Sequence, residues 1–148
     1  MVRKYSQKEC KDLVGVIFGR RHISSKGRNR YYLGDTSHEK MVYVSQSKPS
    51  KDSKGKWEYE FFHTLSVETM IEIIQSGAYL ILLDYINRRH VLLKLEDILW
   101  AFQFNTRIKG EQKEWTLDIV VKELNGEFFL TSYKKKIDNK RLVKVVYA

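Results

Sequence analysis

Residues 79–85 constrain the fold of this chain most strongly, because their sequence, Tyr-Leu-Ile-Leu-Leu-Asp-Tyr, is almost continuously apolar. A strand with one side facing solvent alternates apolar and polar residues, whereas a strand covered on both faces has a continuous apolar run. The run therefore predicts a strand in the centre of a sheet, with other parts of the chain covering both of its faces.

Helices are predicted from capping residues and apolar spacing. Ser6 and Glu9 have the spacing of a capping box, and apolar residues follow at helical intervals, so we expect a helix over residues 7–19. Ser66 and Gly77 occupy the start and end positions expected of a second helix. A short third helix is expected over residues 96–102, where two acidic residues open the first turn.

Strands are predicted on either side of the central run. Residues 31–33 and 40–48 are separated by a turn sequence and form a predicted hairpin, in which Met41 and Tyr43 share one face and Val42 and Val44 the other. Further strands are expected over residues 57–63, 90–95 and 142–147. The Asn125-Gly126 pair is a strong signal for a tight hairpin near the C-terminal end.

The order of these elements predicts an α/β or α+β fold. We expect a mixed β-sheet flanked by the N-terminal helix and the central helix, with a C-terminal antiparallel hairpin. The 148 residues fit a single domain, 1–148, and a separate C-terminal β-subdomain over residues 106–148 is the alternative. The tryptophans Trp57, Trp100 and Trp115 are assigned to packing in this scheme.

Composition limits the class of protein. The single Cys10 excludes an internal disulfide and a cysteine-built zinc site, and it suits a reducing compartment. The first residues do not resemble a signal peptide, and the longest apolar run, residues 78–83, is too short to cross a bilayer. We therefore expect a cytoplasmic protein without a membrane partner.

The charge of the chain predicts a nucleic-acid partner. Its 27 Lys and Arg residues outnumber 18 Asp and Glu, which gives a net charge of +9, and residues 13–34 contain no carboxylate. Such a surface gains affinity by neutralising phosphates, so double-stranded DNA is the expected partner, although the charge could serve solubility alone. A homodimer is a further alternative. The predicted nucleic-acid contacts are Arg20, Arg21, Lys26, Arg28, Arg30, Tyr31, Arg88, Arg89, Lys134, Lys135 and Lys136. Arg88, Arg89 and His90 are expected to form a turn with side chains in solvent.

A possible metal centre lies at the predicted hairpin. Asp35 follows the first strand, and Gln46 and Lys48 lie two residues apart, hence on one face of the second strand. The oxygens of Asp35 and Gln46 suit Mg²⁺, and the neighbouring Lys48 could orient water and offset charge on a phosphate. Ordinary structural roles for all three residues are the alternative.

These three residues resemble the motif of the PD-(D/E)xK nuclease superfamily, which includes restriction endonucleases and junction resolvases. The signature is an Asp on a β-hairpin followed by Glu/Asp-x-Lys on the adjoining strand, and some members carry Gln in place of the acid. The resemblance implies catalytic roles for Asp35, Gln46 and Lys48, and Mg²⁺ bound by Asp35 and Gln46. It also places Glu9 where some relatives have another ligand, although the capping box explains Glu9 fully.

Three functions remain open from the sequence. The first is a nucleic-acid-binding protein that acts as a small Mg²⁺-dependent endonuclease of restriction or resolvase type. The second is a non-catalytic DNA-recognition module of a restriction or defence system, which would use the same basic residues without a metal. The third is a basic inhibitor or regulator that occupies the acidic surface of a nucleic-acid enzyme.

Overall fold

The computed structural model describes the chain except for residues 1, 20–22, 26, 35–39, 52–56, 60, 110, 112–113, 125, 132–139, 144 and 148. The helices are α1 (Gln7–Phe18), α2 (Val67–Ser76) and α3 (Leu95–Asn105). One sheet has the strand order β1 (Ile23–Ser25), β2 (Arg30–Leu33), β3 (Lys40–Ser47), β7 (Tyr79–Asp84), β8 (Arg89–Leu93) and β13 (Val145–Tyr147). The other has the order β12 (Lys140–Val143), β11 (Glu127–Thr131), β10 (Glu114–Leu124) and β6 (Phe61–Ser66), with β9 (Thr106–Lys109) also paired to β10. Strands β4 (Ser50–Lys51) and β5 (Trp57–Tyr59) form a separate pair.

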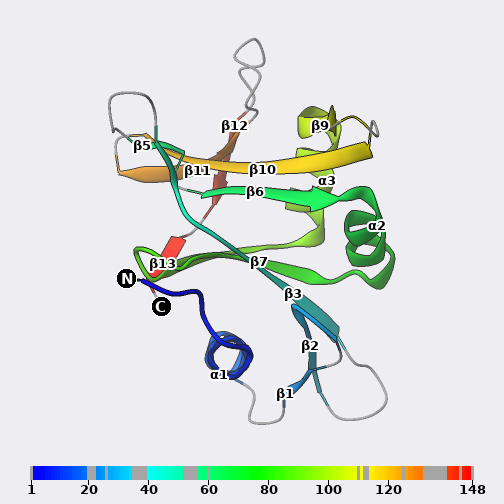
Figure 1. Ribbon diagram of the computed structural model, residues 1–148, viewed down its shortest axis with the longest axis vertical. Coiled ribbons are helices and arrows are strands. Elements are labelled where there is room, and N and C mark those ends of the chain that lie inside the picture. Colours follow the sequence, from blue (N-terminus) through cyan, green and yellow to red (C-terminus); the bar gives the residue numbers. More distant parts are fainter. Residues whose placement is uncertain are drawn as a thin grey trace.

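The architecture is α+β, as predicted. The six-stranded sheet is mixed, because β3 and β7 run parallel while its other neighbours are antiparallel. Helix α1 lies on one side of this sheet, and the second sheet lies on the other side together with α2 and α3 (Figure 1). The N-terminal helix, the central helix and the C-terminal β10–β11 hairpin are all confirmed.

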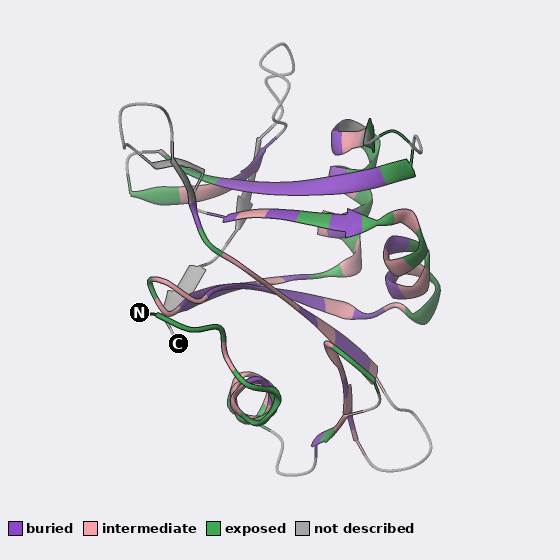
Figure 2. Cartoon of the chain, viewed as in Figure 1, coloured by how far each residue is buried: buried purple, intermediate pink, exposed green. Residues whose placement is uncertain are grey.

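Strand β7 occupies the central position that its apolar sequence predicts. It pairs with β3 on one side and with β8 on the other, and its residues from Leu80 to Asp84 are buried (Figure 2). Leu80 and Leu82 face a core shared with the second sheet, whereas Ile81 and Leu83 face a core under α1. Strands with this continuous apolar pattern are buried on both faces, which explains why β7 connects the two cores.

Strand β3 divides its side chains in the predicted way. Met41 and Tyr43 contribute to the core between the sheets, while Val42 and Val44 contribute to the core under α1. The period of two in a strand sends successive side chains to opposite faces. Gln46, two residues beyond Val44, therefore reaches the α1 side of the sheet.

The helix ends follow the capping signals. Ser6 Oγ accepts a hydrogen bond from Glu9 N at 3.1 Å, and Glu9 Oε1 accepts one from Ser6 N at 3.0 Å, so the predicted capping box is present. Ser66 Oγ likewise accepts from Thr69 N at 3.2 Å at the start of α2. Gly77 ends α2 with a φ of +62°, a conformation that favours glycine.

Several expectations about packing were wrong. Arg89 and His90 are buried, 7% and 4% exposed, because they belong to β8 and not to the preceding turn. Trp115 is 53% exposed and lies across from Ile108 at the end of the β9–β10 pair, so it does not serve core packing. The expected strand 142–147 is divided between β12 and β13, which belong to different sheets.

Within the described part of the chain, none of the helices has both the length and the apolar character needed to span a membrane.

Candidate functional site

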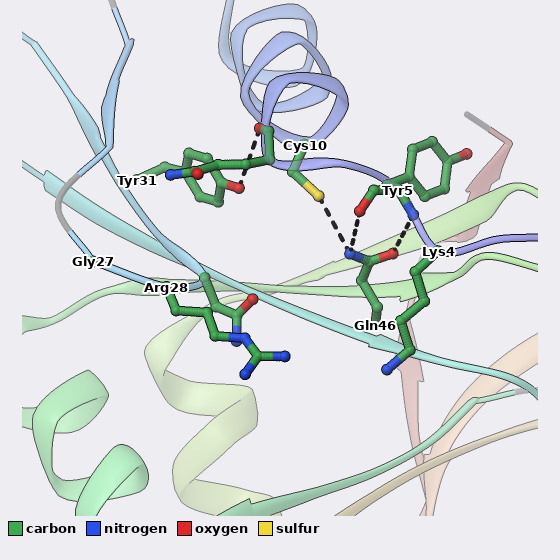
Figure 3. Close-up of a pocket in the computed structure, with 9 residues that line it drawn as sticks. Lys4, Tyr5, Cys10, Gly27, Arg28, Tyr31 and Gln46 are labelled. Carbon is green, nitrogen blue, oxygen red and sulfur yellow. Dashed lines mark hydrogen bonds between the residues drawn. The ribbon is translucent and has the colours of Figure 1, made fainter.

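A pocket of about 530 Å³ opens on the α1 side of the six-stranded sheet (Figure 3). Its described lining residues come from the segment before α1, the first turns of α1, the β1–β2 turn and strands β2 and β3. They are Lys4, Tyr5, Gln7, Cys10, Gly27, Arg28, Asn29, Tyr31 and Gln46. Cys10 and Tyr31 are buried, whereas Lys4, Gln7, Gly27 and Arg28 are exposed. The pocket therefore has a buried floor and a polar rim.

Gln46 fixes one wall of this pocket. Its Oε1 accepts a hydrogen bond from Tyr5 N at 2.7 Å, and its Nε2 donates to Tyr5 O at 2.9 Å (Figure 3). Its Nε2 also lies 3.6 Å from Cys10 Sγ. An amide side chain that pairs with both backbone groups of one residue imitates a strand ladder, so Gln46 ties the segment before α1 to β3.

The β1–β2 turn forms the opposite wall and carries Arg28. Gly27 and Asn29 have φ values of +86° and +66°, and both residue types tolerate this left-handed region better than others. Asn29 O accepts a hydrogen bond from Val44 N at 2.9 Å, which anchors the turn on β3. The backbone on both sides of Arg28 is thus in a turn conformation that is held against the sheet.

The floor is neutral. Tyr31 Oη donates to Gln7 O at 3.3 Å, and burial raises the pKa of this phenol well above its usual value. Burial also raises the pKa of the Cys10 thiol. Both groups keep their protons at neutral pH, so the charge of the pocket comes from its rim.

The rim is basic. Lys4 and Arg28 both line the pocket, and Figure 3 shows their charged ends directed away from α1. None of the described residues that line the pocket is acidic, and no described carboxylate forms an ion pair with Lys4 or Arg28. Two cations without a balancing acid create a positive potential at the opening.

A third cation contacts one of the residues that line the pocket. The Arg88 guanidinium lies over the Tyr5 ring, 4.2 Å from its centroid, and the backbone of Tyr5 is held by Gln46. Arg88 comes from the turn between β7 and β8 and has a φ of +53°. The cation–π contact therefore connects the turn after β7 to Tyr5, although Arg88 itself is not one of the described residues that line the pocket.

Asp84 organises the turn that presents Arg88. This buried carboxylate accepts hydrogen bonds from Ile86 N at 2.9 Å, Asn87 N at 3.1 Å and Asn87 Nδ2 at 2.9 Å. It also accepts one from Arg89 Nε at 3.1 Å. A carboxylate that satisfies several donors in this way fixes the turn, which explains why the apolar run ends in Asp.

The predicted nucleic-acid contacts have different surroundings in the structure. Arg28 lines the pocket, and Arg88 lies over the ring of Tyr5. Arg30 instead forms a bidentate pair with Glu72 of α2, at 2.6 Å and 2.7 Å, and Arg89 is buried between the rings of Phe61 and Phe128. Tyr31 is 2% exposed, so its ring offers no open face for a base. The predicted contacts Arg20, Arg21, Lys26, Lys134, Lys135 and Lys136 lie outside the described residues.

The described residues do not assemble the predicted magnesium site. Asp35 lies outside the described residues, and the carbonyl oxygen of Gln46 already accepts the Tyr5 amide. Lys48 is exposed beyond the end of β3. Groups of three or more His, Cys, Asp or Glu residues able to hold a metal ion are absent from the described part of the chain. The metal site stays a prediction from sequence.

Sequence reasoning missed Lys4. It lies before the predicted helix and outside the basic segment, so its charge gave no local signal. What brings it to Arg28 is the pairing of Gln46 with Tyr5, a contact between residues 41 positions apart. An amide in an otherwise apolar strand face, after Val42 and Val44, was the available hint that this position contacts backbone.

No protein-family model, curated protein or solved structure matches the chain. The function is therefore inferred from the residues that line the pocket and from their charge.

Proposed function

We propose that this protein binds nucleic acid, with duplex DNA as the favoured ligand, through the basic rim formed by Lys4 and Arg28, with Arg88 on the Tyr5 ring as a further cation. The observation that carries the proposal is the pocket opening, where two exposed cations face solvent without an acidic residue among the described lining residues. The net charge of +9 adds a long-range attraction for polyanions.

Counterion release supplies the affinity. Each phosphate neutralised by a fixed cation frees condensed counterions from the nucleic acid, and this term does not depend on sequence. The anchored β1–β2 turn and the cation–π contact hold Arg28 and Arg88 in place before binding. Side chains ordered in advance lose less conformational entropy on binding.

Recognition without cleavage is the form of this function that the geometry favours. Among the described residues of the nuclease-like motif, Gln46 lines the pocket. Both the oxygen and the nitrogen of its side-chain amide are hydrogen-bonded to the Tyr5 backbone. A residue engaged in this way has a complete structural role. We therefore propose a recognition module, and metal-dependent cleavage becomes the outcome that would revise this proposal.

Binding and cleavage are separated by one pair of measurements. Fluorescence anisotropy with a labelled duplex at low salt should report binding, and incubation of the same duplex with Mg²⁺ or Mn²⁺ should leave it intact. Cut strands would support the endonuclease alternative. Absence of binding to DNA and RNA at low salt would refute the nucleic-acid proposal and favour a protein partner with an acidic surface.

A further inference from the structure

The pocket is larger than contact with a duplex backbone requires. Phosphates of a duplex meet a protein at its surface, whereas this pocket has a volume of about 530 Å³ and a buried floor. Sites for small molecules and cofactors have volumes of about 300–1,000 Å³. The volume fits a single nucleotide unit.

Charged groups and neutral groups line different parts of the pocket. The charged ends of Lys4 and Arg28 belong to the exposed rim, where they suit an anion. Gln7 and Asn29, two uncharged polar residues, also line the pocket, and the Gln7 amide nitrogen donates a hydrogen bond to Ser25 Oγ. Amide groups can pair with neutral donors and acceptors. The buried residues Cys10 and Tyr31 add no charge to the pocket, so the part of the hollow away from the rim suits a neutral group. A nucleotide combines these features in one ligand, since it has an anionic phosphate and a flat base with hydrogen-bonding edges.

We propose that the pocket binds one unpaired nucleotide unit, with its phosphate between Lys4 and Arg28 and its base in the hollow. The inference rests on the proposed function when the unit belongs to a nucleic-acid strand, at an end or in an unpaired region. A free nucleoside monophosphate has the same chemistry, so the experiments below distinguish the two sources. A base outside the helical stack is available to such a pocket at a lower energetic cost than a paired one.

The first experiment measures the ligand class by isothermal titration calorimetry. The full chain is titrated with a deoxynucleoside 5′-monophosphate, with the matching deoxynucleoside and with inorganic phosphate. The monophosphate should bind at least about tenfold more tightly than either part, because only it fills both regions of the site. Equal affinity for inorganic phosphate, or no affinity for the monophosphate, would overturn the inference.

Matched variants locate that binding. Arg28→Ala and Lys4→Ala should each weaken monophosphate binding about tenfold, whereas Lys122→Ala should leave it unchanged. Lys122 is an exposed cation on β10 of the other sheet, so its removal lowers the net charge equally without altering the pocket. Circular dichroism and thermal melts establish that all three variants are folded. Equal loss in all three would show a general charge effect and overturn the assigned site.

The second experiment separates this inference from the proposed function. Wild-type protein is titrated with a blunt duplex and with the same duplex carrying one unpaired terminal nucleotide. Tighter binding of the second duplex, with the difference between the two duplexes abolished by excess free monophosphate, supports the inference. Equal binding of both overturns it while nucleic-acid binding stands. Binding of free monophosphate with no binding of either duplex overturns the proposed function and assigns the pocket to free nucleotides.

Discussion

Gln46 joins parts of the chain that are distant in sequence through two hydrogen bonds to Tyr5, at 2.7 Å and 2.9 Å. Its position in β3 puts it on the face that holds Val42 and Val44, where an unpaired amide would be costly. The pairing explains a polar residue on an otherwise apolar face. It also determines where Lys4 lies relative to Arg28.

Gln46→Ala should therefore destabilise the protein by about 1–3 kcal/mol, because it removes both hydrogen bonds and leaves the Tyr5 backbone groups without them. Urea denaturation gives the free energy of unfolding for comparison with wild type. Lys48→Ala, at an exposed position just beyond the end of β3, should change it by less than about 0.5 kcal/mol. Equal stability of the Gln46 variant and wild type would show that the two hydrogen bonds to Tyr5 do not stabilise the folded protein.

Burial determines the protonation state of His63. It is 2% exposed, its Nδ1 lies 2.9 Å from Ser45 Oγ, and its Nε2 has no described hydrogen-bond partner. Burial lowers its pKa from 6.5 to about 3, so it stays neutral in the folded protein. Burial also lowers the pKa of His90.

The pH dependence of stability follows from these shifts. A histidine whose pKa is lowered on folding takes up a proton more readily in the unfolded chain, so stability is present above about pH 6.5 and is lost as pH falls toward the folded pKa. Between about pH 6 and pH 5, His63→Leu should reduce the slope of the unfolding free energy by up to about 1.4 kcal/mol per pH unit. Denaturation at several pH values measures the slope, and an unchanged slope would contradict the assignment.

Among the elements, helix α1 could be predicted from residues that are close together in the sequence, without knowledge of what the helix packs against. The capping box, the apolar stripe and the terminal Gly19 all lie within one stretch of sequence, and the helix begins and ends as they indicate. Arg3 approaches Glu9 Oε1 at 2.5 Å, and hydrogen bonds from Arg3 and Ser6 lower the pKa of this carboxyl to about 2. Glu9 therefore acts as an ionised cap at pH 7.

Ser6→Ala should destabilise the protein by about 1 kcal/mol, because the Glu9 amide loses its acceptor at the start of α1. Val16→Ala is the matched control, since Val16 is 79% exposed on the same helix and should change stability by less than about 0.5 kcal/mol. Thermal melts of both variants compare the two positions. A cap variant as stable as wild type would mean that water replaces the hydroxyl at no cost.

Elements defined by contacts far apart in the sequence were predicted less well than α1. The alternation in β3 and the continuous run in β7 identified both strands and their faces, because each pattern is complete within its own segment. The pairing of β6 with β10, between residues 61–66 and 116–121, has no such local pattern. Arg89 was expected in solvent, since nothing near it in sequence shows that Phe61 and Phe128 would surround its guanidinium.

At the scale of the whole molecule, some basic side chains form ion pairs within the protein, and others are available to a ligand. Arg30 pairs with Glu72, and Arg89 pairs with Asp84, so these charges stabilise connections within the protein. Arg28 and Arg88 remain for a ligand, together with Lys4. The sequence indicated a basic surface, but it could not distinguish these uses. Glu72 lies 42 positions from Arg30 in the chain, and the rings of Phe61 and Phe128 that contact Arg89 are also distant from it in sequence.

The salt dependence of duplex binding in Arg28→Ala and Arg30→Ala tests the central claim most directly. Both changes remove one arginine from the same basic segment, but only Arg28 lines the pocket, while Arg30 is paired with Glu72. Arg28→Ala should weaken binding and reduce the slope of log affinity against log salt by about 0.9 per lost phosphate contact, and Arg30→Ala should leave that slope unchanged. Equal loss of slope in both variants, or an affinity of the wild-type protein that does not depend on salt, would contradict the claim that this rim binds nucleic acid.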